Sequence, residues 1–271
     1  MFKAENFGEP WLEDLVLPFP CEVHHCFPRR QPDPDRFSVL VHYTEPRQLK
    51  AQNKDVLDYA GCFNLILTNE EDLLHLPNAM FALFGGCWVT SIPSSKRFEL
   101  SFLYSNGIGS ESLFSGYQIR RQIWQDQNLI KLPKLFYTSI KRPPVSIENL
   151  NPYPFDSKDA LFESMFSLVV ENEFQKHYFT EKIIDAFRTY TVPIYFGTPN
   201  IGHYFDLSGI IVAHSTDEAI VLINNLKPDD YWARMSAMVR NFELAERYIH
   251  LLETIKRYIS EGYRLNRRRS K

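Results

Sequence analysis

The sequence lacks several patterns that would assign a function directly. Its four cysteines form no CxxC pair, so neither a zinc site nor a redox motif of that type is indicated. No apolar run is long enough to cross a membrane, and the N-terminal stretch lacks the apolar core of a signal peptide. The net charge of −3 gives no support for a nucleic-acid partner. We therefore expect a cytoplasmic protein with reduced thiols.

A complete dinucleotide-binding glycine pattern is also missing. Gly107-Ile108-Gly109 is the nearest feature to GxGxxG, and it lacks the third glycine at the required spacing. This absence argues against an NAD-dependent oxidoreductase.

Metal-binding patterns are weak. Asp33-Pro34-Asp35 is formally a DxD motif, but it lies in a proline-rich turn before the first clear strand, where we expect no metal site. The run His24–Cys26 mimics metal ligands, yet adjacent residues of a strand point to opposite faces. We interpret these three residues as surface residues.

The composition fits a folded α/β protein. The 271 residues are 44% hydrophobic and 14% aromatic, enough for one large domain or two of ordinary size. Strand patterns alternate with helical ones, including a helix from about 116 to 125, which is typical of a parallel sheet with covered faces. The predicted strands are Phe37–Tyr43, Phe63–Thr68, Phe98–Tyr104, Leu135–Ser139, Phe166–Val170, Val192–Phe196 and Ile210–Ala213.

One proline-rich segment is the candidate connection between two domains. Pro143–Pro154 contains four prolines and little periodicity. It divides the chain into an N-terminal domain, residues 1–142, and a C-terminal domain with a helical tail, residues 143–271. The tail itself ends in a basic run from Arg264, which is typical of a frayed terminus or of weak attachment to an anionic membrane.

The most informative segment runs from Phe166 to Asp206. It reads as strand, polar loop, helix and strand, a βαβ unit with polar residues at the carboxyl end of its first strand. Thr180 suits an N-cap, and Glu181 lies in the first turn, where the helix dipole favours a negative charge. Lys182 adds a positive charge beside helix amides that can bind phosphate.

These residues resemble the donor-binding region of the α-1,3-fucosyltransferases, glycosyltransferase family 10. The matching pattern is Glu-Asn after a strand, an aromatic, Thr-Glu-Lys, a helix, then Pro-x-Tyr, Gly and Pro. The matches are Glu171, Asn172, Tyr178, Thr180, Glu181, Lys182, Pro193, Tyr195, Gly197 and Pro199. The clear resemblance covers roughly a sixth of the chain, with weaker similarity upstream.

The resemblance implies a GT-B fold, with two Rossmann-like domains facing an interdomain cleft. It also implies a nucleotide-sugar donor and an inverting transfer to a glycan acceptor, without a metal or other cofactor. In that family the Glu and Lys of the Thr-Glu-Lys segment hold the donor's ribose and diphosphate. The donor-binding residues expected here are Asn106, Arg120, Glu171, Asn172, Tyr178, Thr180, Glu181 and Lys182.

A general base is needed near the acceptor hydroxyl. The segment His42–Pro46 resembles the family's base region, which makes Glu45 the catalytic candidate. The alternatives are His42 and the carboxylates that follow the next strand, Glu70, Glu71 and Asp72.

The donor and the activity itself have alternatives. Many family members carry Lys or Arg where this chain has Met165, a position expected to face the donor phosphates. This departure permits another donor, such as UDP-xylose, on the same fold. A second alternative is an inactive domain that only binds glycan, against which the intact Glu181-Lys182 pair argues. The acceptor glycan does not follow from the sequence, because acceptor loops vary on a common scaffold.

Overall fold

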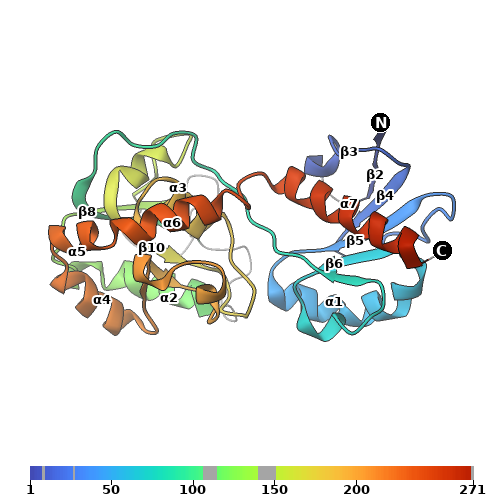
Figure 1. The fold of residues 1–271 in the computed structure, drawn as a ribbon. Coiled ribbons are helices and arrows are strands. Elements are labelled where there is room, and N and C mark those ends of the chain that lie inside the picture. The colour runs from blue at the N-terminus through green and yellow to red at the C-terminus, as the bar shows by residue number, and fades with distance from the viewer. Residues whose placement is uncertain (8–9, 27, 106–114, 140–150, 270–271) are drawn as a thin grey trace. The chain divides into compact units, whose positions relative to one another are not determined.

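The computed structural model describes residues 1–7, 10–26, 28–105, 115–139 and 151–269. The chain divides into two compact units (Figure 1). Unit 1 consists of Met1–Phe84 together with His250–Lys271, and unit 2 is Gly85–Ile249. No helix within the described ranges is both long and apolar enough to span a bilayer.

Unit 1 is built on a parallel five-stranded sheet. Its strands, in spatial order, are β2 (Glu5–Phe7), β4 (Cys21–His25), β5 (Phe37–His42), β6 (Leu65–Thr68) and β7 (Ala79–Phe81). Two short strands, β1 (Phe2–Lys3) and β3 (Val16–Leu17), form a separate antiparallel pair, and they precede and follow β2 in the sequence.

Helices cover both faces of the unit 1 sheet. Val39 and Val41 of β5 belong to the same apolar cluster as Ile255 and Ile259 of α7 (Leu251–Arg269). The intervening Leu40 packs in a second cluster, which contains Val56 of α1 (Pro46–Tyr59). Alternate residues of a strand therefore meet different helices, as expected of a doubly covered sheet.

Unit 2 contains a second parallel five-stranded sheet. Its spatial order is β12 (Ile211–Val212), β11 (Val192–Phe196), β10 (Ser164–Val170), β8 (Arg97–Tyr104) and β9 (Lys134–Thr138). Counted along the chain, this is the doubly wound order 2-1-3-4-5, whose switch point lies between β8 and β10. In such sheets, ligands bind outside the carboxyl ends of the strands at that point.

The helices of unit 2 pack in two groups. One contains α2 (Ser115–Gln125) and α4 (Thr216–Asn225), and the other contains α3 (Glu181–Arg188) and α6 (Met235–Ala245). A short helix, α5 (Pro228–Ala233), precedes α6. Figure 1 shows β10 between the two groups.

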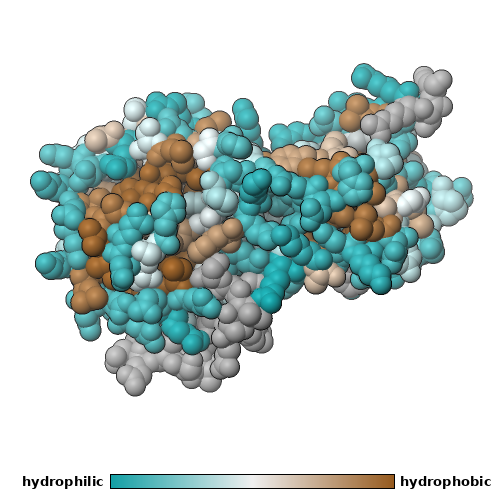
Figure 2. Space-filling model, turned by 90° about the horizontal axis from the view of Figure 1, so that it is seen from below, coloured by the Kyte–Doolittle hydropathy of each residue, from teal (hydrophilic) through white to brown (hydrophobic). Residues whose placement is uncertain are grey.

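On the face shown in Figure 2, unit 2 has broad apolar areas among hydrophilic side chains. Exposed large apolar side chains of this unit include Leu129, Val221 and Trp232. Scattered apolar side chains of this kind are normal on folded proteins.

Each predicted strand is present within a residue or two of its expected bounds, but the predicted division of the chain differs from the one observed. β8 was expected in the N-terminal domain, and it belongs with β9 to the sheet of unit 2. Pro152, in the described part of the proline-rich segment, pairs with Thr138 of β9, and the whole segment belongs to unit 2. It is therefore a connection inside unit 2. Its residues 140–150 lie outside the described part of the chain.

The expected surface role of His24 and His25 is wrong, because both lie in the buried strand β4. His24 tolerates burial because its Nε2 lies 2.6 Å from Oε1 of the equally buried Glu22. Burial lowers the pKa of His24 despite this carboxylate. A neutral, hydrogen-bonded imidazole costs far less to bury than a charged one.

Candidate functional site

The predicted donor-binding residues lie together at the switch point of unit 2. Glu171 and Asn172 follow the carboxyl end of β10, and Thr180–Lys182 begin α3. Ser105 follows β8 on the other side of the switch point. The next predicted residue, Asn106, lies outside the described residues.

Thr180 caps α3 as the sequence predicts. Its side chain accepts a hydrogen bond from the backbone amide of Lys182, and its own hydroxyl donates to Oε2 of Glu171 at 2.7 Å. The amide of Thr180 donates to Oε1 of the same carboxylate at 2.9 Å. Glu171 is fully buried, so both of its oxygens fix the start of the helix, and the structure gives it a holding role within the site.

Lys182 and Glu181 lie within a network of charges. The Lys182 ammonium is 3.6 Å from Oε2 of Glu171 and 3.5 Å from Oε1 of Glu181, and it donates to the Thr180 hydroxyl at 3.0 Å. Burial would raise the pKa of Glu181, but the ammonium groups of Lys182 and Lys158 outweigh it and hold that pKa at about 2. Glu181 is therefore a carboxylate at neutral pH. Burial raises the pKa of Glu171, against the opposing charge of Lys182.

Arg120 of α2 joins the two strand ends. Its guanidinium donates to the carbonyl oxygens of Ser105, at 3.3 Å, and Val170, at 3.2 Å, and to Oδ1 of Asn172 at 2.7 Å. The side chain is only 2% exposed. This geometry gives Arg120 a clear structural task at the switch point, in addition to the phosphate contact expected from the sequence.

Gly116 was missed by the sequence analysis. It lies in the first turn of α2, and its amide donates to the carbonyl of Asn172 at 3.2 Å. A Cβ added here would lie 1.8 Å from the carbonyl oxygen of Glu171. Only glycine allows the helix to approach the strand end this closely. The available signal was a glycine at the start of a predicted helix that follows a strand.

Tyr178 is largely buried, and Met165 lies near the amino end of β10. Tyr178 is 3% exposed, so its ring is largely enclosed by protein. Met165 is the second residue of β10 and five residues from its carboxyl end, which is roughly 16 Å along a strand. The expectation that position 165 faces the donor phosphates is therefore wrong, and Met165 says nothing about the donor. Tyr195 and Phe196 are buried core residues.

Glu45 lies in unit 1 at the start of α1, just beyond the carboxyl end of β5. Its side chain is half-buried and does not cap the helix. Glu70 follows the neighbouring strand β6, so both carboxylates lie at the same edge of the sheet. His42 is fully buried, and burial lowers its pKa to about 4. His42 is therefore less accessible to an acceptor than the half-buried Glu45.

The remaining candidates of the sequence analysis fall elsewhere. Asp33 bonds Arg36 and the amide of Asp35, as in an ordinary turn. Among the described residues, no group of three or more His, Cys, Asp or Glu side chains is arranged to hold a metal. The four cysteines, all within the described ranges, form no disulfide.

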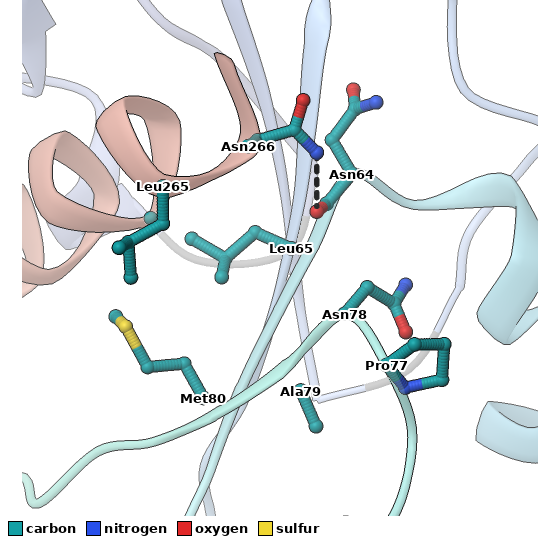
Figure 3. A pocket seen from close by; sticks show the side chains of 9 residues that line it. Asn64, Leu65, Pro77, Asn78, Ala79, Met80, Leu265 and Asn266 are labelled. Carbon is teal, nitrogen blue, oxygen red and sulfur yellow. Dashed lines mark hydrogen bonds between the residues drawn. The ribbon is translucent and has the colours of Figure 1, made fainter. Parts of the chain in front are cut away.

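A shallow pocket of about 90 Å³ lies in unit 1 between the β6–β7 edge and α7 (Figure 3). Leu65, Met80 and Leu265 give it apolar walls. The Asn78 amide at its rim already donates to two backbone carbonyls, at 2.8 Å each. None of the predicted site residues lines this pocket.

Comparisons with known proteins agree with the motif. No model of a known protein family matches the chain. A stretch of 85 residues, 30% of this chain, is 36% identical to the alpha-(1,3)-fucosyltransferase FucT of Helicobacter pylori and spans 18% of that protein.

Two solved structures share the fold. A crystal structure of an α1,3-fucosyltransferase with GDP aligns over 90% of this chain and 77% of that one, with a TM-score of 0.53 and 16% identity. A structure from E. coli described as trehalose-6-phosphate bound with UDP-2-fluoro glucose aligns over 92% and 74%, with a TM-score of 0.56 and 9% identity. The chain therefore has the α/β architecture of GT-B glycosyltransferases, and its resemblance to the α-1,3-fucosyltransferases is confirmed.

Proposed function

We propose that this chain is an inverting glycosyltransferase, which moves fucose or a similar sugar from a nucleoside-diphosphate donor to a glycan hydroxyl. The observation that carries the proposal is the helix start at Thr180–Lys182, fixed by Glu171 at the switch point of a parallel sheet. The local identity to a fucosyltransferase supports the sugar, and the fold supports the use of a nucleotide sugar.

Three residues are proposed to contact the donor directly. Lys182 and the first amides of α3 attract the diphosphate. Glu181, ionised at neutral pH, accepts hydrogen bonds from the ribose hydroxyls. Asn172, whose Oδ1 accepts a hydrogen bond from Arg120, is proposed to contact the sugar or phosphate.

The remaining donor-site residues hold this arrangement. Glu171 and Thr180 fix the start of α3, and Arg120 fixes the strand ends at Val170 and Ser105. Tyr178, largely enclosed, supports the loop between β10 and α3.

The reaction proposed is a direct displacement. Glu45 takes the proton of the acceptor hydroxyl, whose oxygen forms a bond to the anomeric carbon. The bond from that carbon to the donor phosphate oxygen breaks at the same time, and the nucleoside diphosphate leaves with the electron pair. Because the donor bond is already activated, no covalent enzyme intermediate is needed.

A metal is not part of the proposal, because Lys182 and the helix amides supply the positive charge for the leaving group. We expect transfer activity to survive EDTA. Loss of activity on chelation, restored by Mn²⁺, would contradict this part of the proposal. Asp33 and Asp35 would then be the candidate metal ligands.

The donor is tested by ligand-induced stabilisation. A nucleotide whose free concentration is a hundred times its Kd stabilises the folded state by about 2.7 kcal/mol. Thermal unfolding with GDP, UDP, ADP and NAD, followed by transfer assays with GDP-fucose and UDP-xylose, separates the candidates. Stabilisation by GDP with fucose transfer is the expected result. Binding of glycan with no transfer from either donor would favour the inactive glycan-binding alternative.

Cytoplasmic location and a weak membrane contact are further parts of the proposal. The end of α7 exposes Arg264, Arg267 and Arg268 on a regular helix rather than on a frayed end. Exposed basic side chains attract anionic lipid surfaces. Co-sedimentation with phosphatidylserine vesicles at low and high salt tests this contact, and equal binding to neutral vesicles would count against it.

A further inference from the structure

Lys158 lies beside the donor site, although no sequence motif marks it. It precedes the short turn that leads into β10. Its ammonium is 3.0 Å from Oδ2 of Asp185 and 3.4 Å from Oε1 of Glu181. The Lys158 side chain is 17% exposed, and Asp185, one turn after Glu181 in α3, has no exposed side-chain surface.

Lys158 is held in place from several directions. The ammonium lies 4.3 Å from the centre of the Trp88 ring, within range of a cation–π interaction. The Trp88 amide donates to the other oxygen of Asp185 at 2.7 Å. Next to Lys158, Asp159 accepts from the amide of Thr90 at 2.8 Å. These contacts leave the Lys158 side chain little freedom to move.

Two ammonium groups therefore reach the same oxygen of Glu181. The Lys158 ammonium is 3.4 Å from Oε1 of Glu181, and the Lys182 ammonium is 3.5 Å from the same oxygen. Lys182 is the more exposed of the two, at 24%, and it is the residue proposed to meet phosphate. When Lys182 turns toward an anion, Lys158 is the partner that stays with Glu181.

We propose that Lys158 is a positioning residue of the donor site, which keeps the Glu181 carboxylate in place while Lys182 binds the phosphates of a nucleoside diphosphate. The proposal rests on the function proposed above and adds a residue to that site. Asp185 has an indirect role in this arrangement, because it holds the ammonium of Lys158 in place.

The surrounding charges show why Lys158 matters. The charged groups around Glu181 are the carboxylates of Glu171 and Asp185 and the cations of Lys158, Lys182 and Arg120. Without Lys158, three carboxylates share two cations, and one of those cations is committed to the ligand. The pKa of Glu181 then rises from about 2, and the carboxylate protonates in mildly acidic solution. Ribose binding through Glu181 becomes dependent on pH.

The experiment is isothermal titration of the full chain from pH 5 to pH 8. The probe is GDP, or UDP if UDP stabilises the wild-type chain more. Lys158→Met removes the charge, Lys158→Arg keeps it, and Lys131→Met is the matched control, because Lys131 is an exposed lysine of the same unit. We expect Lys158→Met to bind about tenfold more weakly at pH 7, as for the loss of a charged hydrogen bond, and to weaken further toward pH 5. Lys158→Arg and Lys131→Met should follow the wild type.

Because Lys158→Met leaves Asp185 buried without its cation, it can fail to fold. The double variant Lys158→Met/Asp185→Asn removes both charges. It should fold and bind about as weakly at pH 7, with less acid sensitivity than Lys158→Met, because Asp185 no longer adds a negative charge. If a folded Lys158→Met variant binds with the affinity and pH profile of the wild type while Lys182→Ala loses affinity, the role proposed for Lys158 is wrong and the proposed function still stands. A wild-type chain that binds neither nucleotide overturns the proposed function and this inference with it.

Discussion

Single residues at the donor site have separable roles. Lys182→Ala and Glu181→Ala should each weaken nucleoside-diphosphate binding about ten- to a hundredfold, because a charged hydrogen bond contributes about 1.5–3 kcal/mol. Isothermal titration measures the affinity, and circular dichroism confirms that each variant is folded. Unchanged affinity in both variants would reject the assignment of the site.

Glu45 is predicted to matter for rate and not for donor binding. Glu45→Gln keeps the size of the side chain but cannot take a proton, and loss of a general base costs about 10²–10⁴ in rate. We expect normal nucleotide affinity and turnover at least about a hundredfold slower, measured in a transfer assay. Normal turnover in Glu45→Gln, with loss of activity in Glu70→Gln, would move the base to the end of β6.

At the scale of elements, the approach of α2 to β10 depends on Gly116. Gly116→Ala should lower the free energy of unfolding by about 1–3 kcal/mol or more, the usual range for overpacking, because its Cβ meets backbone that cannot yield. Gly61→Ala is the control, since a Cβ there meets nothing within 4 Å. Urea unfolding compares the two variants. Equal stability would contradict the close helix–strand contact.

At the amino ends of the strands of the unit 2 sheet, the partly buried Lys96 makes stability depend on pH. The Lys96 ammonium donates to the Thr191 hydroxyl at 2.6 Å and to the carbonyls of Phe162 and Ser164, and burial lowers its pKa to about 7. Between about pH 7 and the ordinary lysine pKa near 10.5, the unfolded chain binds more protons than the folded one. Stability should therefore rise with pH in this window and change little below it.

Thermal unfolding of the wild type and of Lys96→Met isolates this effect. The difference in melting temperature between the two should shift in favour of the wild type as the pH rises from 7 to 10. A constant difference across that range would show that Lys96 keeps an ordinary pKa.

Sequence reasoning succeeded where the signal is local. The Thr180 cap follows from the chemistry of its side chain, and the central strands follow from the pattern of apolar residues along the sequence. It failed for β4, because the pairing of buried Glu22 with buried His24 becomes visible only in the folded chain. It also missed Lys158 with Asp185, which are 27 residues apart in sequence and meet only after the chain has folded.

At the scale of the whole molecule, the division into units depends on strand order, which propensity does not reveal. The proline-rich segment predicts a domain boundary, yet the chain passes from unit 1 to unit 2 at residues 84–85 and returns to unit 1 at residues 249–250. Unit 2 is thus one continuous segment that holds all the described donor-site residues. We expect residues 85–249, produced alone, to bind the nucleotide that the full chain binds. Titration of the two proteins compares their affinities, and a folded fragment without affinity would mean that residues outside unit 2 contribute to donor binding.

The return of the chain to unit 1 has a consequence for biosynthesis. Ile255 and Ile259 of α7 complete the apolar cluster that also contains residues of β4, β5 and β6. On a ribosome those strands emerge first, and α7 emerges only after all of unit 2. The nascent sheet must wait with one face uncovered while unit 2 is synthesised and folds. Premature termination before α7 would release a chain with an exposed apolar sheet face, a substrate for chaperones and proteases.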